Sequence, residues 1–353
     1  MSLTGFPGLA VYFLVISGFA AGVTALVLRH LRIIDVPNER SSHSAPTPRG
    51  GELGIVLGFF LALTLIFLFG GTAAATPLRS LPVAGFLGAV LLIGGISLHD
   101  DVAERGFSSK LLTQLVAVAG VMACGGVADP RQLGIDADWA WIVWPLTLLW
   151  MVGLTNAYNF MDGLDGMAGG TAVIVAAFFA AICHQLGLPF LALAALAICA
   201  GACGFLLFNW PPARIFMGDI GSTFLGFAFA ALAILAANDA ADASPLMLLV
   251  MPLLLLHYLF DTVFTFCRRL LAGENVVTAH RSHLYQLLNR SGWSHRAVSL
   301  LYAAIACMQG VAALWLSAGA GNIARAWVIL PLLLGHALFA AWVIRRARAA
   351  ALL

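Results

Sequence analysis

The stretch LAVYFLVISGFAAGVTALVL, residues 9–28, has no charged residue and is long enough to cross the hydrocarbon core of a membrane as a helix. It is too long for the apolar part of a signal peptide, so we expect a retained first span. Similar apolar runs of about 17–24 residues recur along the chain. We predict spans at residues 7–28, 51–70, 81–98, 111–128, 139–157, 167–186, 188–208, 221–237, 244–267, 297–318 and 323–344.

The composition indicates a chain that lies largely in lipid. Of 353 residues, 61% are hydrophobic and 10% are charged, whereas a soluble domain carries roughly 25% charged residues. We therefore predict an all-α fold, a polytopic transmembrane helical bundle of about 11 spans in a single domain, residues 1–353. Ten spans are the alternative, because only Gly187-Leu188-Pro189 divides two of the runs. The six cysteines follow no metal-ligand pattern and are interpreted as small apolar residues.

The cations favour one side of this bundle. Of 18 Lys and Arg residues, all but Arg79, Arg131 and Arg325 fall in loops or the tail on the side of the first loop. The positive-inside rule makes that side cytoplasmic, with the N-terminus periplasmic and the C-terminus cytoplasmic. The cytoplasmic loops are predicted near residues 29–50, 99–110, 158–166, 209–220 and 268–296.

Two acidic motifs lie in these loops. Asp100 and Asp101 end the third span, and Lys110 opens the next. Adjacent carboxylates suit a metal or phosphate site, although a solvated helix end is the alternative. The segment NAYNFMDGLDG, residues 156–166, places Asn159, Asp162 and Asp165 at intervals of three, on one face of a helix. Helix capping would explain one of these acids but not both.

Three further segments complete the polar set. In residues 208–222, Asp219 stands between glycines before a helix, where a phosphate and its Mg²⁺ would fit, and a plain N-cap is the alternative. Residues 274–286 and 35–51 are basic loops that could bind phosphate or sugar, or serve as simple connectors. Asp261, inside the ninth span, is a functional candidate or the ion-pair partner of Arg268 or Arg269.

All these motifs fall on the predicted cytoplasmic side. Acids and amides beside basic loops at a membrane face predict a Mg²⁺-dependent enzyme that joins a lipid phosphate to a soluble, phosphate-bearing donor. A transporter should instead hold its acids near the bilayer midplane on inverted repeats, which the sequence lacks. A receptor or scaffold would not need this density of acids and amides.

The motifs resemble a known family. His-Asp-Asp at 99–101, NAYNFMDGLDG at 156–166, FMGDIGS at 216–222 and HRSHLYQ at 280–286 occur in this order. The chain resembles the polyprenyl-phosphate N-acetylhexosamine-1-phosphate transferases (glycosyltransferase family 4) over about residues 35–300. It looks most similar to the bacterial branch that starts O-antigen or other surface-polysaccharide synthesis on undecaprenyl phosphate. The phospho-N-acetylmuramoyl-pentapeptide transferases are the alternative, but they carry three consecutive histidines in the late loop, which this chain lacks.

The resemblance implies a reaction. Undecaprenyl phosphate attacks the β-phosphorus of a UDP-N-acetylhexosamine, UMP leaves, and Mg²⁺, or Mn²⁺ in its place, assists. Direct displacement is favoured over a covalent intermediate, and the identity of the sugar is left open. The resemblance further implies the bacterial inner membrane as location and membrane lipids as surroundings, allows a homodimer, and gives no role to nucleic acid.

The resemblance also assigns residues by motif. Asp219 is the principal expected metal ligand, helped by Asn159 and by Asp101. The expected catalytic residues are Asp100, Asp101, Lys110 and Asp162. The expected substrate contacts are Asp165 to uracil, Phe216 stacked on uracil, Asn209 to uridine, and Arg49, His280, Arg281 and His283 in the two basic loops. Glu52 departs from the family pattern, since many relatives have a small residue there, which puts the detailed role of the early loop in doubt.

Overall fold

The fold is described from a computed structural model. It describes residues 3, 5–31, 34–35, 46–103, 107–240, 247–276, 278, 280–318 and 322–353, with side chains except at 97–103, 107 and 322–326. The helices of the first half are α1 (Phe6–His30), α2 (Leu53–Phe69), α3 (Gly71–Ala75), η1 (Thr76–Arg79), α4 (Leu81–Ala103), α5 (Phe107–Ala123), η2 (Pro130–Leu133), η3 (Ala137–Ile142) and α6 (Val143–Phe160). Those of the second half are α7 (Met167–Gln185), α8 (Pro189–Asn209), α9 (Gly218–Asp239), α10 (Met247–Leu254), α11 (Leu256–Leu271), α12 (Leu284–Arg290), α13 (His295–Ser317) and α14 (Asn322–Ala349).

The predicted all-α class is confirmed, and helix occupies most of each of the 11 predicted ranges. Among the described residues, seven helices are long and apolar enough to cross a membrane, and nine spans result if each of two bent helix pairs counts as one. Leu53–Phe69 and Ser108–Ala123 are shorter apolar helices. The doubtful division at Gly187-Leu188-Pro189 is confirmed, because α7 ends at Gln185 and α8 begins at Pro189. The span count of 11 itself stays a prediction.

The ninth predicted span is not one straight helix. Residues 247–271 form α10 and α11, which meet at Leu255 with a bend of 69°. Pro252 lies within α10, where it lacks an N–H for the helical ladder and so weakens the turn before the bend. Hydrophobic periodicity over residues 244–267 could not reveal this bend, because both halves are apolar.

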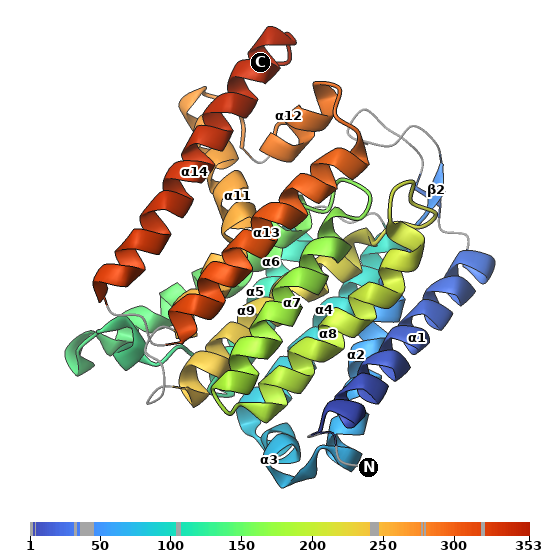
Figure 1. Ribbon diagram of the computed structural model, residues 1–353, viewed down its shortest axis with the longest axis vertical. Helices are drawn as coiled ribbons and strands as arrows, with labels where there is room; N and C mark the ends of the chain where they lie inside the picture. The colour runs from blue at the N-terminus through green and yellow to red at the C-terminus, as the bar shows by residue number, and fades with distance from the viewer. Residues whose placement is uncertain are drawn as a thin grey trace.

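The core of the bundle is α9. Every residue from Ile220 to Ala237 is buried, as expected for a helix that is apolar on all sides and enclosed by others. It contacts α6, α4, α10 and α8, while α1, α8, α7 and α13 lie side by side on the face seen in Figure 1.

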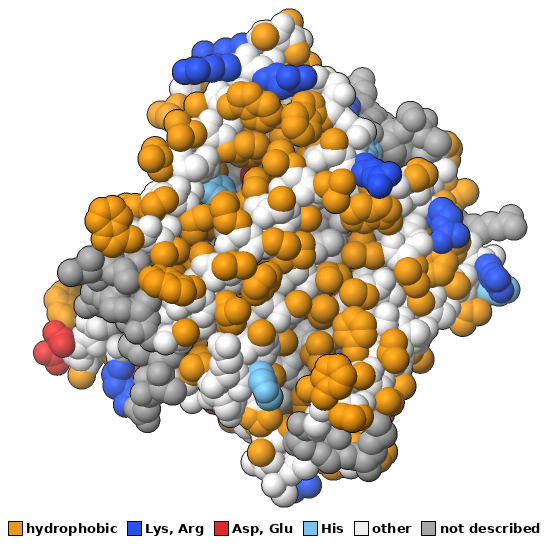
Figure 2. Space-filling view, viewed as in Figure 1, with side chains coloured by type: hydrophobic (Ala, Val, Ile, Leu, Met, Phe, Trp, Pro, Cys, Tyr) orange, Lys and Arg blue, Asp and Glu red, His pale blue; other side chains and the backbone are white. Residues whose placement is uncertain are grey.

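One end of the bundle carries the polar loops. Figure 1 shows β2 and α12 at the same end as the C-terminus, opposite α3 and the N-terminus. There β1 (Ile34–Asp35) pairs antiparallel with β2 (Thr47–Pro48), and a parallel bridge joins Arg49 to Phe216. Figure 2 shows hydrophobic side chains over the middle of the visible face and most of its Lys and Arg side chains toward this end.

Candidate active site

Three predicted site residues meet where α5, α6 and α9 come together. The Lys110 ammonium group pairs with the Oδ2 atom of Asp219. The Asn159 amide nitrogen lies 3.4 Å from Asp219 Oδ1 and donates a 2.9 Å hydrogen bond to Ser222 Oγ. Asp219 lies 109 residues from Lys110 and 60 residues from Asn159 along the chain, and no sequence pattern predicts that the three meet.

A small pocket opens at this junction. Its lining residues come from α4, α5, α6 and α9, and they are Ile93, Ile96, Lys110, Thr113, Gln114, Asn156, Asn159, Phe160, Asp219 and Thr223. Gln114, which the sequence analysis missed, accepts a 2.6 Å hydrogen bond from the Asn156 amide. Its signal was present, because Gln114 lies four residues after Lys110 and so on the same helix face.

The predicted catalytic pair Asp100 and Asp101 falls at the end of α4, the helix that gives Ile93 and Ile96 to the pocket. Their side chains lie outside the described part of the structure. In the part that is described, no three His, Cys, Asp or Glu side chains are grouped closely enough to hold a metal ion by themselves. One carboxylate with one amide still fits Mg²⁺, which commonly takes one or two carboxylates and completes its shell with water and substrate phosphate.

The turn between α6 and α7 holds two acids in contrasting environments. The pKa of Asp162 is raised to about 7, mainly by burial and also by the nearby carboxylates of Asp219 and Asp165. Burial also acts to raise the pKa of Asp165, but hydrogen bonds from His295 and from the Ala213 N–H outweigh it and leave that pKa below its usual value. Asp165 Oδ1 lies 3.0 Å from His295 Nδ1, and Oδ2 lies 3.0 Å from the Ala213 nitrogen.

His295, at the start of α13, is a site residue that the sequence analysis missed. It lies 130 residues from Asp165, and no motif links the two. Asn209, predicted to contact uridine, is buried and uses both ends of its amide within the protein. Its oxygen accepts from the Gly166 N–H at 2.9 Å, and its nitrogen donates to the Ile215 carbonyl at 2.9 Å. It therefore ties the α6–α7 turn to the loop that precedes α9.

The early loop is joined to that same loop by its backbone. The Phe216 N–H donates to the Pro48 carbonyl at 2.8 Å, and the Gly51 N–H donates to the Phe216 carbonyl at 3.2 Å. Arg49 and Phe216, two predicted substrate contacts, are thus paired across an isolated parallel bridge. Glu52, the departure from the family pattern, is 1% exposed and packs against the backbone at Gly218 and Gly221, just beside Asp219.

The late loop folds back onto the pocket. The rings of His283 and Phe160 stack with centroids 6.1 Å apart, and those of His280 and His283 lie 4.9 Å apart. Phe160 also lines the pocket, so only its ring separates His283 of this loop from the pocket. The pKa of His280 is lowered to about 4, mainly by burial and also by the neighbouring arginines Arg269 and Arg268, so this ring is neutral at pH 7. Arg281 lies in the same loop, where its carbonyl accepts from the Arg290 side chain at 2.9 Å.

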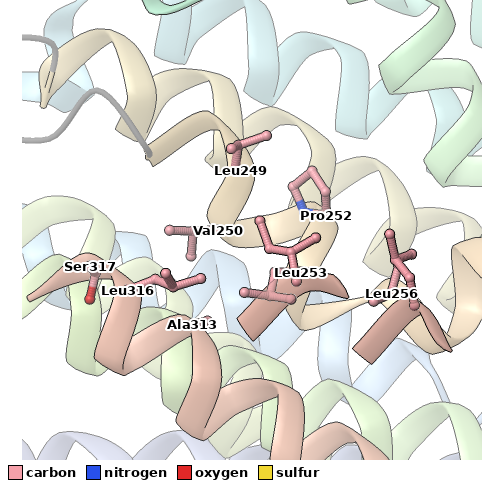
Figure 3. A pocket seen from close by; sticks show the side chains of 10 residues that line it. Leu249, Val250, Pro252, Leu253, Leu256, Ala313, Leu316 and Ser317 are labelled. Atoms are coloured by element: carbon pink, nitrogen blue, oxygen red, sulfur yellow. The ribbon is translucent and has the colours of Figure 1, made fainter. Parts of the chain in front are cut away.

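A second pocket is unrelated to the predicted site. Leu249, Pro252, Leu253 and Leu316 are among the mostly aliphatic residues that line it, at the junction of α10, α11, α13 and α14 (Figure 3). None of the predicted site residues lines it.

The acids, amides and cations at one end of an apolar bundle fit the chemistry expected from the sequence, and comparison with known proteins shows the family. The model of "Glycosyl transferase family 4" matches residues 83–237. A Bacillus subtilis protein named as a probable undecaprenyl-phosphate N-acetylglucosaminyl 1-phosphate transferase is 30% identical, with 80% of this chain and 79% of the relative aligned. The chain belongs to glycosyl transferase family 4.

Other members of family 4 show how far the similarity extends. A decaprenyl-phosphate N-acetylglucosaminephosphotransferase of Mycobacterium leprae is 32% identical, over 81% of this chain and 77% of the relative. A phospho-N-acetylmuramoyl-pentapeptide-transferase of Heliobacterium modesticaldum is 34% identical, over 55% of this chain and 62% of the relative. The segment matched by the family model includes the pocket residues Lys110, Asn159 and Asp219, whereas Arg49 and the late-loop histidines lie outside it.

Proposed function

We propose that this protein transfers an N-acetylhexosamine 1-phosphate from a UDP-sugar to undecaprenyl phosphate, releasing UMP, as the first step of a surface polysaccharide such as O-antigen. The main support is the pocket where Asp219, Asn159 and Lys110 meet at the polar end of an apolar bundle. Relatives named for transfer of N-acetylglucosamine phosphate to polyprenyl phosphates align with four fifths of the chain. We place the protein in the bacterial plasma membrane with this end in the cytoplasm.

In the proposed reaction, an oxygen of the lipid phosphate forms a bond to the β-phosphorus of the donor. The bond from that phosphorus to the bridging oxygen breaks, and the electron pair leaves with UMP. A lipid phosphate is largely ionised near pH 7, so the protein needs to orient and neutralise the reacting groups more than to abstract a proton. This favours direct displacement over a covalent enzyme intermediate.

The side chains divide the work as follows in this proposal. Asp219 and Asn159 hold Mg²⁺, which neutralises charge on the donor diphosphate. Lys110, now paired with Asp219, is placed to exchange that partner for a substrate phosphate. Asp100, Asp101 and Asp162 surround the reacting centre. Phe216, Asp165 and Asn209 form the uridine site, while His280, Arg281, His283 and Arg49 contact the phosphates and the sugar.

Peptidoglycan precursor synthesis is the second candidate, because phospho-N-acetylmuramoyl-pentapeptide transferases also align with this chain. Those alignments cover only 55% of the chain in the Heliobacterium case, against 80% for the N-acetylglucosaminyl phosphate transferase of Bacillus. The late loop reads His280-Arg281-Ser282-His283, without three consecutive histidines. The surface-polysaccharide assignment is therefore preferred.

The test is UMP release by purified protein supplied with undecaprenyl phosphate, Mg²⁺ and a panel of UDP-N-acetylhexosamines, with the lipid product weighed by mass spectrometry. We expect release with one or more donors, loss on chelation by EDTA, and recovery when Mg²⁺ is added back. Asp219→Asn should lower turnover roughly a hundredfold or more, because it removes a charged metal ligand. The matched control is Asp136→Asn, which changes an exposed acid at the N-cap of η3, at the opposite end, and should remain active.

Two outcomes would contradict the proposal. Failure of every UDP-N-acetylhexosamine to yield UMP would exclude the transferase activity. Near-normal turnover of Asp219→Asn at ordinary Mg²⁺, with an unchanged melting temperature, would exclude Asp219 as the metal ligand.

A further inference from the structure

Asp261 is an acid in the interior of α11 that none of the assigned roles uses. It is 1% exposed, yet both carboxylate oxygens are fully engaged. The groups that hydrogen-bond to it come from its own helix, the late loop and α13, and they are Thr265 Oγ1 (3.1 Å), His283 Nδ1 (3.2 Å), the backbone nitrogens of Leu284 (2.9 Å) and Tyr285 (3.3 Å), and Tyr302 Oη (3.0 Å).

The neighbouring arginines do not explain this acid. Arg269 donates to Glu274 at 2.7 Å and to the Asn275 carbonyl at 2.7 Å, and Arg268 donates to the Ser282 carbonyl at 3.0 Å. The expected alternative of an ion pair between Asp261 and one of these arginines is therefore replaced by a bond to His283. An ionised carboxylate only accepts hydrogen bonds, so the facing Nδ1 atom of His283 carries its proton.

The same cluster reaches the pocket through Tyr285. The Tyr285 hydroxyl donates to the Phe160 carbonyl at 2.9 Å, at the end of α6. It also fills the space beside Gly163, where an added Cβ would lie only 2.1 Å from the hydroxyl oxygen. Because Phe160 stacks on His283 and lines the pocket, a continuous series of contacts joins Asp261 in α11 to the pocket.

We propose that Asp261 is a positioning residue that fixes the late loop, through His283 and the backbone of Leu284 and Tyr285, in the conformation that binds the diphosphate of the donor. This inference rests on the proposed function and assigns diphosphate binding and nucleoside binding to different parts of the site. The uridine contacts come from the α6–α7 turn and the Phe216 loop, which Asp261 does not contact directly. The cluster reaches that turn only at Phe160 and Gly163, through Tyr285, whereas Asp165 is held separately by His295 and the Ala213 N–H. Loss of Asp261 should therefore weaken diphosphate binding and leave nucleoside binding intact.

The test compares UDP and uridine as probes, because neither depends on which sugar the enzyme accepts. Calorimetry on the full-length protein with Mg²⁺ measures both affinities for the unmodified chain and for Asp261→Asn, which keeps the shape but loses the charge. We expect UDP affinity to fall about tenfold or more, since hydrogen bonds to a charged group are the strong ones, while uridine affinity changes by less than about twofold. Phe216→Ala should weaken both ligands.

Tyr285→Phe keeps the test decisive if Asp261→Asn does not fold, because it removes only the hydrogen bond to the Phe160 carbonyl. It should give the same pattern at smaller amplitude. Thr265→Val, which removes one donor and leaves the carboxylate in place, is the matched control and should bind both probes normally. Unchanged UDP affinity in the Asp261 and Tyr285 variants, or an equal loss of uridine affinity, would overturn the inference. If the unmodified chain bound neither probe, the proposed function itself would fail.

Discussion

Asp162 and Asp165 lie three residues apart in one motif, yet their surroundings give the two carboxyl groups different pKa values. Asp165 has His295 and the Ala213 N–H as partners and stays ionised. Asp162 is buried near the carboxylates of Asp219 and Asp165, and together these effects raise its pKa to about 7. In sequence the two acids look equivalent, and only the contacts from α13 and the Ala213 loop separate them.

This difference predicts that Mg²⁺ binding is linked to a proton. Below about pH 7 the Asp162 carboxyl is mostly protonated, and a divalent cation favours the ionised form, so binding expels the proton. Mg²⁺ affinity should rise with pH, by up to roughly tenfold per unit below the pKa, and level off above it. Calorimetry in buffers of different ionisation enthalpy measures the proton released, which should approach one at pH 6 and vanish at pH 8.

The control for this linkage is Asp162→Asn, which has no proton to release there. Its Mg²⁺ affinity should be weaker than that of the unmodified chain at pH 8 but nearly flat with pH. Equal Mg²⁺ affinity of the unmodified protein at pH 6 and pH 8 would contradict the prediction.

At the scale of elements, close helix contact depends on small residues. The α1 helix packs against α8 at Gly204, where an added Cβ would lie 2.3 Å from the Ser17 carbonyl oxygen, and against α2 at Gly54. In lipid, packing of this kind replaces the hydrophobic effect as the force between helices. These glycines let α1 and α2 support the early loop that carries Arg49.

Gly204→Ala should therefore destabilise the protein by about 1–3 kcal/mol, because the methyl group must push two backbones apart. Gly153→Ala is the matched control, since an added Cβ there meets nothing within 4 Å. It should be neutral or slightly stabilising, as alanine is the better helix former. Thermal unfolding in detergent compares the two. Equal melting temperatures for both variants would show that the α1–α8 contact is looser than described.

The elements also show what the sequence could predict. Apolar runs and the positions of Pro189 and Gly187 located the helices, because lipid leaves the backbone few alternatives. The bend at Leu255 and the strand-like bridge between Arg49 and Phe216 escaped prediction, because both depend on contacts between distant segments. The motif residues were found by type and spacing, whereas His295, Gln114 and the partners of Asp261 needed the folded chain.

At the scale of the whole molecule, the two ends of the bundle differ in character. The strand β2, the helix α12 and the C-terminus lie at one end, and the N-terminus and α3 at the other (Figure 1). The pocket belongs to the first of these ends, because its lining residue Asp219 lies three residues after Phe216, which bridges to Arg49 beside β2. On η3 and the start of α6, Trp139, Trp141 and Trp144 are exposed, as in the aromatic belts found at membrane interfaces. Termini at opposite ends agree with an odd number of crossings, and the cation count predicts that the pocket end faces the cytoplasm.

This orientation decides whether the proposed reaction can occur, because a nucleotide sugar made in the cytosol reaches only a cytoplasmic pocket. It can be tested by adding one cysteine at a time to a chain whose exposed or partly exposed Cys124, Cys203, Cys267 and Cys307 are changed to serine, which leaves only the buried Cys183 and Cys199. A thiol reagent that does not cross the inner membrane should label Asp136→Cys in intact cells, since that loop is expected in the periplasm. Leu353→Cys, at the other end, should react only after the inner membrane is opened. The reverse labelling pattern would place Asp219 and Lys110 on the periplasmic side, where they could not reach cytosolic UDP-sugar. It would therefore contradict both the predicted orientation and the proposed function.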